Sequence, residues 1–321
     1  MLKYIGKRLL MMIPVLLGVI FIVFSLIEIT PGDPVRLMLG DSAREEDVIA
    51  MREELGLDDP FLVKFGRYVT GLVTRGDFGT SYESGRPVMT EIMERFPMTL
   101  KLAVLSAAVA VIFGVVCGII SATRQYSIFD NVATAVSLIG VSMPNFWQGL
   151  MAVLIFSVWL KWLPASGSYG PEYWVLPALT LGTSCAASIM RTTRSSMLEV
   201  VRQDYIRTAR AKGQSEKIVV LRHALKNALI PVITVIGIQF GSLLGGSVLV
   251  ESVFAMPGLG KYMIDAIKMR DFPVVQGSVL FLAIAFSFVN LAVDIIYSFI
   301  DPRIKSQYKS NKKKKEATAN G

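Results

Sequence analysis

Few residues of this 321-residue chain have the types and spacing that catalysis or metal binding requires. The sequence has one histidine, His223, and two cysteines, Cys117 and Cys185, which both lie inside apolar runs. Cysteines in such runs usually act as small, buried packing residues. No group of His, Cys and carboxylate residues has the spacing of metal ligands. The Gly-x-x-x-x-Gly-Lys-Ser/Thr loop that cradles nucleotide phosphates is also missing from the sequence. We therefore predict that the chain has no catalytic residue, metal site or cofactor of its own.

The most prominent polar interruption between apolar runs is the basic segment from Met197 to Pro231. Within it, Asp204–Gly213 is predicted to form a short helix that ends at Gly213, because glycine readily adopts the left-handed C-terminal turn. A second helix is predicted to follow, with basic residues opposite its apolar ones. The apolar residues that recur in it at helical spacing are Ile218, Leu221, Leu225 and Leu229. A cytoplasmic loop that only obeys the positive-inside rule would carry the same charge, so charge alone leaves both interpretations open.

The composition of the chain places it among membrane proteins. Hydrophobic residues make up 53% of the sequence, charged residues only 18%, and the mean hydropathy is +0.53. The net charge of +8 does not indicate a nucleic-acid partner, because the basic residues gather at the ends of apolar runs and in the tail Lys312–Lys315. We expect membrane lipid, and no nucleic acid, around this chain.

Six apolar runs predict six transmembrane helices. Pro144 should kink or interrupt the third run, and Gly114 and Gly118 give the second a small-residue face for close helix packing. Positive charges in the short loops place both termini in the cytoplasm. The six runs are Leu9–Ile29, Leu100–Ala122, Val132–Leu160, a run that starts near Val175 and continues as a stalk, Ala228–Val250 and Val275–Ile300.

The only sizeable soluble segment, Gly32–Pro97, lies between the first two of these runs. It is rich in acidic residues, and helical spacing predicts helices at Ala43–Leu57 and Phe61–Val73. A glycine-rich loop or short strand, Arg75–Gly85, should follow. The segment is expected on the extracytoplasmic side, either as a cap over the helices or as a platform for a soluble partner.

The fifth run has two different faces at ~100° per residue. Glycines four residues apart predict a packing face, whereas Gln239, Ser242 and Gly246 lie on roughly the opposite side. A glutamine at membrane depth needs a polar partner or water, so these three residues are candidates for a translocation pathway. A hydrogen bond between helices would explain Gln239 and Ser242 equally well. The glycines are Gly237, Gly241 and Gly245.

The basic segment resembles the loop by which permease subunits of ATP-binding-cassette importers dock their ATPases. Arg207–Ala209 followed by Gly213 is similar to the Glu-Ala-Ala, three residues, Gly pattern, with Arg207 and Thr208 in place of Glu and Ala. The strings DYIRTARAKG and RHALKNALIP resemble the form that this loop takes in the dipeptide, oligopeptide and nickel branch. The resemblance implies a docking loop made of Asp204, Tyr205, Arg207, Thr208, Ala209, Arg210, Ala211, Lys212 and Gly213.

Further short strings along the chain resemble the same branch, and their order makes the resemblance specific. They are Thr30–Pro34, Ser142–Trp147, Arg194–Glu199, Phe254 with Pro257–Gly260, Asp271–Gly277, and Asp294 with Asp301–Arg303. The resemblance implies an all-α membrane protein with six transmembrane helices of the type I importer permease kind and an extracytoplasmic insertion after the first helix. The domains implied are residues 1–31 with the first helix, the extracytoplasmic segment 32–98, the permease core 99–303 with its coupling loop 197–227, and a basic cytoplasmic tail 304–321.

The resemblance also implies partners in the cell membrane. These are a second, different permease subunit, two cytoplasmic ATPases that hold ATP and Mg, and an extracytoplasmic substrate-binding protein. Short peptides are the commonest cargo of the branch, with nickel complexes, glutathione and other small solutes as alternatives. ATP hydrolysis is expected on the ATPases, so this chain would not itself be an enzyme.

Two other classes of membrane protein fit the sequence less well. An ion-driven carrier would need acidic residues near the middle of the membrane, and the one candidate, Asp294, lies near the inner end of the last run, where pairing with a basic group is favoured. An intramembrane hydrolase would need a catalytic pair of residues at a plausible depth, and the sequence offers none.

Overall fold

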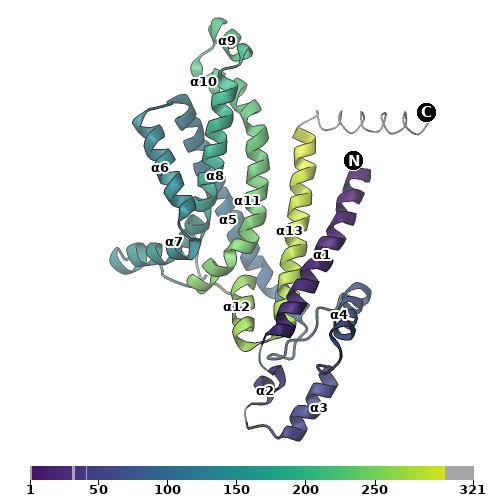
Figure 1. The fold of residues 1–321 in the computed structure, drawn as a ribbon. Coiled ribbons are helices and arrows are strands. Elements are labelled where there is room, and N and C mark those ends of the chain that lie inside the picture. Colours follow the sequence, from purple (N-terminus) through teal and green to yellow (C-terminus); the bar gives the residue numbers. More distant parts are fainter. Residues whose placement is uncertain (1, 31–32, 41, 301–321) are drawn as a thin grey trace, which may run out of the picture. The chain divides into compact units, whose positions relative to one another are not determined.

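A computed structural model describes residues 2–30, 33–40 and 42–300, and these are almost entirely helical (Figure 1). Within these residues, β pairing is limited to a single antiparallel bridge between Thr80 and Pro87. The predicted all-α class is confirmed. The predicted tail 304–321 and the string Asp301–Arg303 lie outside the described residues.

Among the described residues, five helices contain a stretch that is long and apolar enough to cross a membrane. The first begins earlier than the apolar run predicted, and the second begins at Val88, well before Leu100. The fourth continues past Arg194 without a break, as predicted for a stalk. The five helices are α1 (Leu2–Ile29), α5 (Val88–Thr123), α8 (Val175–Val201), α11 (Leu225–Val253) and α13 (Phe272–Ile300).

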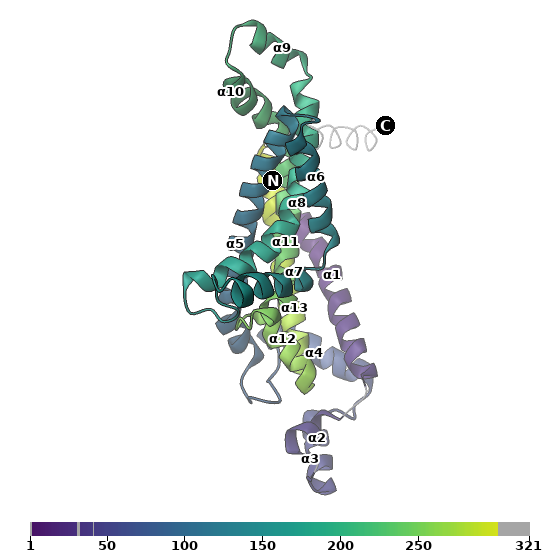
Figure 2. The same cartoon turned by 90° about the vertical axis from the view of Figure 1, so that its left-hand side faces the viewer.

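A sixth span is present only if a bent pair of helices counts as one. α6 (Ile128–Ser142) is followed by α7 (Asn145–Ala152) and the π-helical turn η1 (Val153–Trp159), and the two parts differ in direction by 108°. Figure 2 shows α7 turning sharply away from α6. Pro144 lies at the N-cap of α7, so the predicted interruption is confirmed and the third run is not one straight helix.

The chain divides into two compact units, each built from separate stretches of sequence. The first takes its residues from 1–102, 156–174 and 244–287, and the second from 103–155, 175–243 and 288–321. Boundaries between the units fall inside α5, α11 and α13, so each of these helices contributes to both units.

The first unit holds the helices of the predicted extracytoplasmic segment. They are α2 (Pro34–Leu39), α3 (Glu45–Leu55) and α4 (Phe61–Arg75), and α3 and α4 confirm the two predicted helices. α3 has three acidic residues in its first turn, where their negative charges interact favourably with the helix dipole. The ring of Phe61 stacks on that of Phe65 in α4, and both rings contact Phe24 of α1 edge-on.

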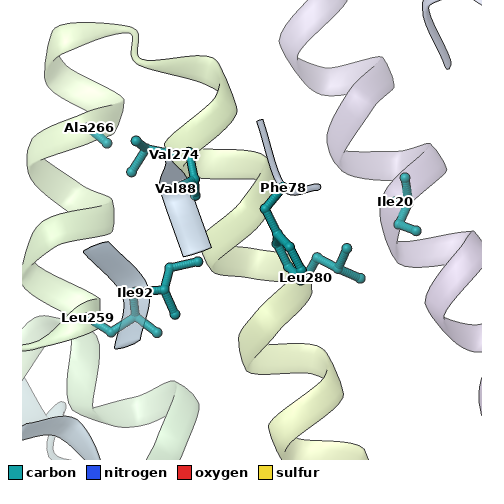
Figure 3. Close-up of a cluster of buried hydrophobic side chains, with 8 residues drawn as sticks. All are labelled: Ile20, Phe78, Val88, Ile92, Leu259, Ala266, Val274 and Leu280. Atoms are coloured by element: carbon teal, nitrogen blue, oxygen red, sulfur yellow. The ribbon is translucent and has the colours of Figure 1, made fainter. Parts of the chain in front are cut away.

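The core of the first unit is an apolar cluster (Figure 3). It joins the start of α5 to α12 (Leu259–Met269) and α13, with Phe78 supplied by the glycine-rich loop. The buried residues are Ile20, Phe78, Val88, Ile92, Leu259, Ala266, Val274 and Leu280.

The first unit also contains the 3₁₀ turn η2 (Pro171–Trp174) and the end of α11. Two side chains bind the N-terminus of α12. Buried Glu251 accepts a hydrogen bond from the Lys261 backbone N–H (3.0 Å), and Thr99 accepts one from the Leu259 N–H (2.9 Å). Because the first N–H groups of a helix have no partner within it, these two acceptors fix where α12 begins.

The second unit is organised around close contact between α5 and α8. A Cβ atom added to Gly114 would lie 2.7 Å from the Ile189 side chain, and one added to Gly118 would lie 2.5 Å from Thr193. The Met190 carbonyl oxygen would be only 2.9 Å from the added atom on Gly118. The predicted role of these two glycines in close packing is confirmed.

Candidate functional site: the basic segment between α8 and α11

The basic segment forms two short helical pieces at one end of the α8 and α11 pair (Figure 1). After α8 ends at Val201, the chain forms α9 (Asp204–Ala211) and, beyond Gly213, α10 (Glu216–Ile218). The π-helical turn η3 (Val219–Ala224) then leads into α11. The helix, Gly turn, helix arrangement predicted from the sequence is therefore present.

α9 is held by an apolar core beneath it. Ile206 and Ala209, three residues apart and thus on one face of the helix, are both buried. They pack in a cluster with residues from α5, α8, η3 and α11, and we call this cluster the anchor core. Its buried members are Ala122, Met197, Ile206, Ala209, Val219, Val220, Ala224 and Ala228.

The turn after α9 depends on Gly213. Its φ of 76° lies in the left-handed region, which residues with a Cβ rarely adopt, and its N–H donates to the Arg210 carbonyl (2.9 Å). α9 itself ends at Ala211, so Gly213 is part of the turn and not the residue next to the helix. The predicted role of Gly213 is confirmed.

The predicted apolar face of the second helix is only partly buried: Leu225 packs against the anchor core, but Ile218 and Leu221 do not. Ile218 and Leu221 are 45% and 47% exposed, whereas Val219, Val220 and Ala224 are buried in the anchor core. The π-helical turn η3 starts at Val219, and its i to i+5 bonding moves the residues from there on, Leu221 among them, away from the positions that 3.6-residue spacing predicts.

The basic segment exposes both apolar and charged side chains. We call five of them the tip residues: Tyr205, Arg207, Lys212, Ile218 and Leu221. Tyr205 is 44% exposed and accepts a hydrogen bond from the Asn227 side chain (2.8 Å). Arg207 pairs only loosely with Asp204, at 3.7 Å. Exposed apolar residues beside cations on a rigid base are suited to contact with another protein.

The other predicted docking residues serve mainly the segment itself. Arg210 forms a two-pronged ion pair with Glu216 (2.7 and 3.1 Å), which raises the pKa of the Arg210 guanidinium above its usual range. This pair ties α9 to α10 across the turn. Thr208 donates to the Asp204 carbonyl (3.0 Å), and Ala211 is exposed.

The second unit also contains a buried ion pair that was not predicted from the sequence. Asp130, only 1% exposed, accepts two hydrogen bonds from Arg194 of α8, both 2.7 Å long. The Ser121 hydroxyl of α5 and the Tyr126 N–H (2.9 Å) also donate to Asp130. The one available signal was a lone acidic residue at the start of an apolar run, because its partner is 64 positions away.

The predicted pathway residues all lie on α11 but have separate surroundings. Ser242 is exposed, and its hydroxyl donates within its own helix, to the Ile238 carbonyl (3.1 Å). The side chain of half-buried Gln239 has no hydrogen-bond partner within the part of the chain that the structure describes. A Cβ added to Gly246 would meet no other atom within 4 Å. None of the three is bonded to the tip residues among the described contacts.

The predicted glycine face of α11 is only partly a packing face. Gly237 and Gly241 are buried, and a Cβ on Gly237 would lie 2.2 Å from the Val293 side chain. Gly245 is exposed, and a Cβ added to it would meet no atom of the described chain within 4 Å.

Family comparisons cover nearly the whole chain. Residues 114–306 match the family described as "Binding-protein-dependent transport system inner membrane component". Residues 1–103 match the family of the N-terminal part of such membrane components.

Two curated relatives and one solved structure illustrate the similarity. The dipeptide transport system permease protein DppB of Alkalihalophilus pseudofirmus is 44% identical, over 95% of this chain and 100% of the relative. The glutathione transport system permease protein GsiC of Salmonella paratyphi A is 47% identical, over 95% of this chain and 99% of the relative. A chain of the MetNI methionine ABC transporter, in an inward-facing conformation, has the same fold with a TM-score of 0.55 at 21% identity. That match covers 66% of this chain and 97% of the other.

Proposed function

Because this chain belongs to the family of binding-protein-dependent transport system inner membrane components, we propose that it is the permease subunit through which an ATP-driven importer carries short peptides. The named cargoes of its relatives support this substrate class. One relative is a dipeptide permease and another a glutathione permease, and glutathione is a tripeptide.

The proposed assembly contains a second, different permease subunit, two cytoplasmic ATPases and an extracytoplasmic substrate-binding protein. ATP and Mg bind to the ATPases, because this sequence has no phosphate-binding loop. Both termini and the basic segment face the cytoplasm, and residues 32–98 face outward. Nickel complexes or another small solute are the alternative cargo for the same machinery.

The observation that carries the coupling role is the anchor core. Ile206 and Ala209 of α9 pack in one buried cluster with Met197 of α8 and Ala228 of α11. When ATP binding closes the two ATPases, a force on the tip residues moves α9. Since a close-packed cluster transmits displacement, α8 and α11 move with it and the pathway opens outward. ATP can bias this change only if the ATPase contacts at the tip residues differ between the two states.

Cross-linking tests the docking role directly. A Tyr205→Cys variant in the assembled importer is expected to cross-link to an ATPase subunit, with a yield that changes when ATP is added. A matched Tyr169→Cys variant, at a position 91% exposed in the aromatic turn before α8, should give no such product. Equal products from both variants, or none from Tyr205→Cys, would refute docking through the tip residues.

Reconstitution separates this function from an ion-driven carrier. Vesicles that contain the full assembly should take up a labelled dipeptide only with ATP and the binding protein present. Vesicles that contain this chain alone should take up none under an ion gradient. Gradient-driven uptake by the chain alone would establish the carrier instead.

A further inference from the structure

The bend after α6 sets the direction of the helix that follows it. α7 and η1 run at 108° to α6, and Figure 2 shows this change of direction. Transmembrane helices tilt by only ~20° from the bilayer normal on average. If α6 crosses the bilayer, α7 therefore lies close to the plane of the membrane.

The length of α6 gives the depth of the bend. α6 has 15 residues, and at ~1.5 Å per residue it is ~22 Å long. It begins beside the charges of Asp130 and Arg194, which belong near the headgroups on the side of the basic segment. Because the hydrocarbon core is ~30 Å thick, α6 ends ~8 Å short of the opposite headgroups. Helices that lie in the membrane interface are buried ~5–10 Å deep, so α7 starts at a suitable depth.

Hydrogen bonds within the chain make the bend compatible with lipid around it. Pro144 has no N–H, which leaves the Gly140 carbonyl without its usual donor four residues on. The Gln148 amide donates to that carbonyl (2.9 Å) and to the Met143 carbonyl (3.0 Å). Its oxygen accepts from the Thr183 hydroxyl of α8 (3.2 Å). Since backbone groups in lipid must be bonded within the protein, Gln148 allows the chain to bend inside the bilayer.

The exposed face of the segment after the bend is apolar. Between residues 145 and 155 every exposed side chain is large and apolar: Phe146 and Trp147, each 43% exposed, Leu150 at 48% and Ile155 at 38%. Gln148 lies on roughly the opposite side from Phe146 and Leu150, at ~100° per residue. Contacts between helices in membranes favour small residues, so this face is better suited to acyl chains than to another helix.

We propose that residues 145–155 bind the surface of one membrane leaflet, with Phe146, Trp147 and Leu150 among the acyl chains just beneath the headgroups. Residues 131–160 include no charged side chain, and an indole ring such as that of Trp147 is favoured at this depth. α6 alone is then the third crossing. The leaflet is the outer one, a statement that rests on the orientation proposed above.

Spin-label depth measurements test this placement. The full-length chain is assembled with its partner subunits in phosphatidylethanolamine–phosphatidylglycerol vesicles, after Cys117→Ala and Cys185→Ala have removed the native thiols. Labels on Phe146→Cys and Leu150→Cys should be reached by oxygen more than by a water-soluble nickel chelate. They should also lie at equal depths.

α6 provides the matched control in the same preparations. Val132 and Val136 are 55% and 61% exposed and are also four residues apart. Because α6 crosses the bilayer, labels on Val132→Cys and Val136→Cys should differ in depth by ~6 Å, at ~1.5 Å per residue.

A further variant tests the bend itself. Gln148→Met keeps the size of the side chain but leaves the Gly140 and Met143 carbonyls without their donor. The melting temperature in the same vesicles should therefore fall. Gln239→Met is the matched control, because the Gln239 side chain has no hydrogen-bond partner among the described residues. Equal melting of the two variants would contradict a bend that is closed by Gln148 inside the bilayer.

Three results would overturn the lipid placement. A depth difference of ~6 Å between labels at 146 and 150 would make the segment part of a crossing. Greater access to the nickel chelate than to oxygen would place it in water. Access to neither reagent would show that another subunit covers it. The measurement needs neither ATP nor a transported peptide, so its outcome is independent of the proposed cargo and coupling.

Discussion

Two ion pairs in the second unit use the same residue types in opposite ways. Arg194 and Asp130 are joined by two bonds of 2.7 Å, and the Asp130 side chain is almost fully buried. Arg207 and Asp204 are 3.7 Å apart, with side chains 75% and 97% exposed. The first pair holds helices together, whereas the second leaves its charges accessible to a partner.

The expected energies of the two pairs differ accordingly. Removing one member of a buried pair leaves a charge without water or a partner, at a cost of ~3–5 kcal/mol. An exposed pair contributes only ~0–1 kcal/mol. A stability measurement should therefore detect the buried cluster, and a transport measurement should detect the tip residues.

The largest effect on stability is expected for Asp130→Ala. This change leaves Arg194 without its carboxylate and the Tyr126 N–H without an acceptor, so unfolding should become easier by ~3–5 kcal/mol. Thermal unfolding of the purified protein in detergent measures it. Asp130→Asn keeps an acceptor and should be less destabilised. Equal melting temperatures for Asp130→Ala and the unaltered protein would contradict a structural role for the pair.

A smaller loss is expected for Gly118→Ala. The new methyl group would press on Thr193 and on the Met190 carbonyl oxygen, which forces α5 and α8 apart at a cost of ~1–3 kcal/mol. Gly140→Ala on α6 is the matched control, because a Cβ there meets nothing within 4 Å. The control should be neutral or slightly stabilising. If both variants melt alike, the contact between α5 and α8 is looser than described.

Gly213→Pro should combine a modest loss of stability with complete loss of transport. Proline cannot adopt a φ of 76° and lacks the N–H that bonds Arg210, so the turn that presents the tip residues is lost, at ~1–3 kcal/mol. Uptake into vesicles and membrane insertion are measured together. Gly213→Asn, which tolerates the left-handed conformation, should retain most uptake. Full activity of the proline variant would refute coupling through this turn.

Charge reversal of the exposed arginines should have the smallest effect on stability. Arg207→Glu is expected to shift the melting temperature little, since exposed pairs contribute ~0–1 kcal/mol. Adding Arg210→Glu also replaces the ion pair with Glu216 by two like charges, so the double variant should melt somewhat lower. ATP-driven uptake should nevertheless be abolished, because the tip would repel the surface it docks on. Arg44→Glu provides a control outside the basic segment. Normal uptake by the charge-reversed variants would show that these positive charges contribute only to the membrane topology of the chain.

The sequence alone was sufficient for features that depend on neighbouring residues. Apolar runs predicted the spanning helices, Pro144 the break after α6, and Gly213 the turn after α9. Each follows from backbone preferences or from the length of an apolar run, which act within a few turns of the chain.

Only the tertiary structure decided which side chains meet. The partner of Asp130 lies 64 positions away on another helix, and no local pattern identifies it. The π-helical turn η3 leaves Leu221 exposed and buries Val219 and Val220 in the anchor core, a departure from the regular helical period that the local sequence did not indicate. A cavity beside Tyr68 likewise forms only where residues of α1, α4 and α13 come together.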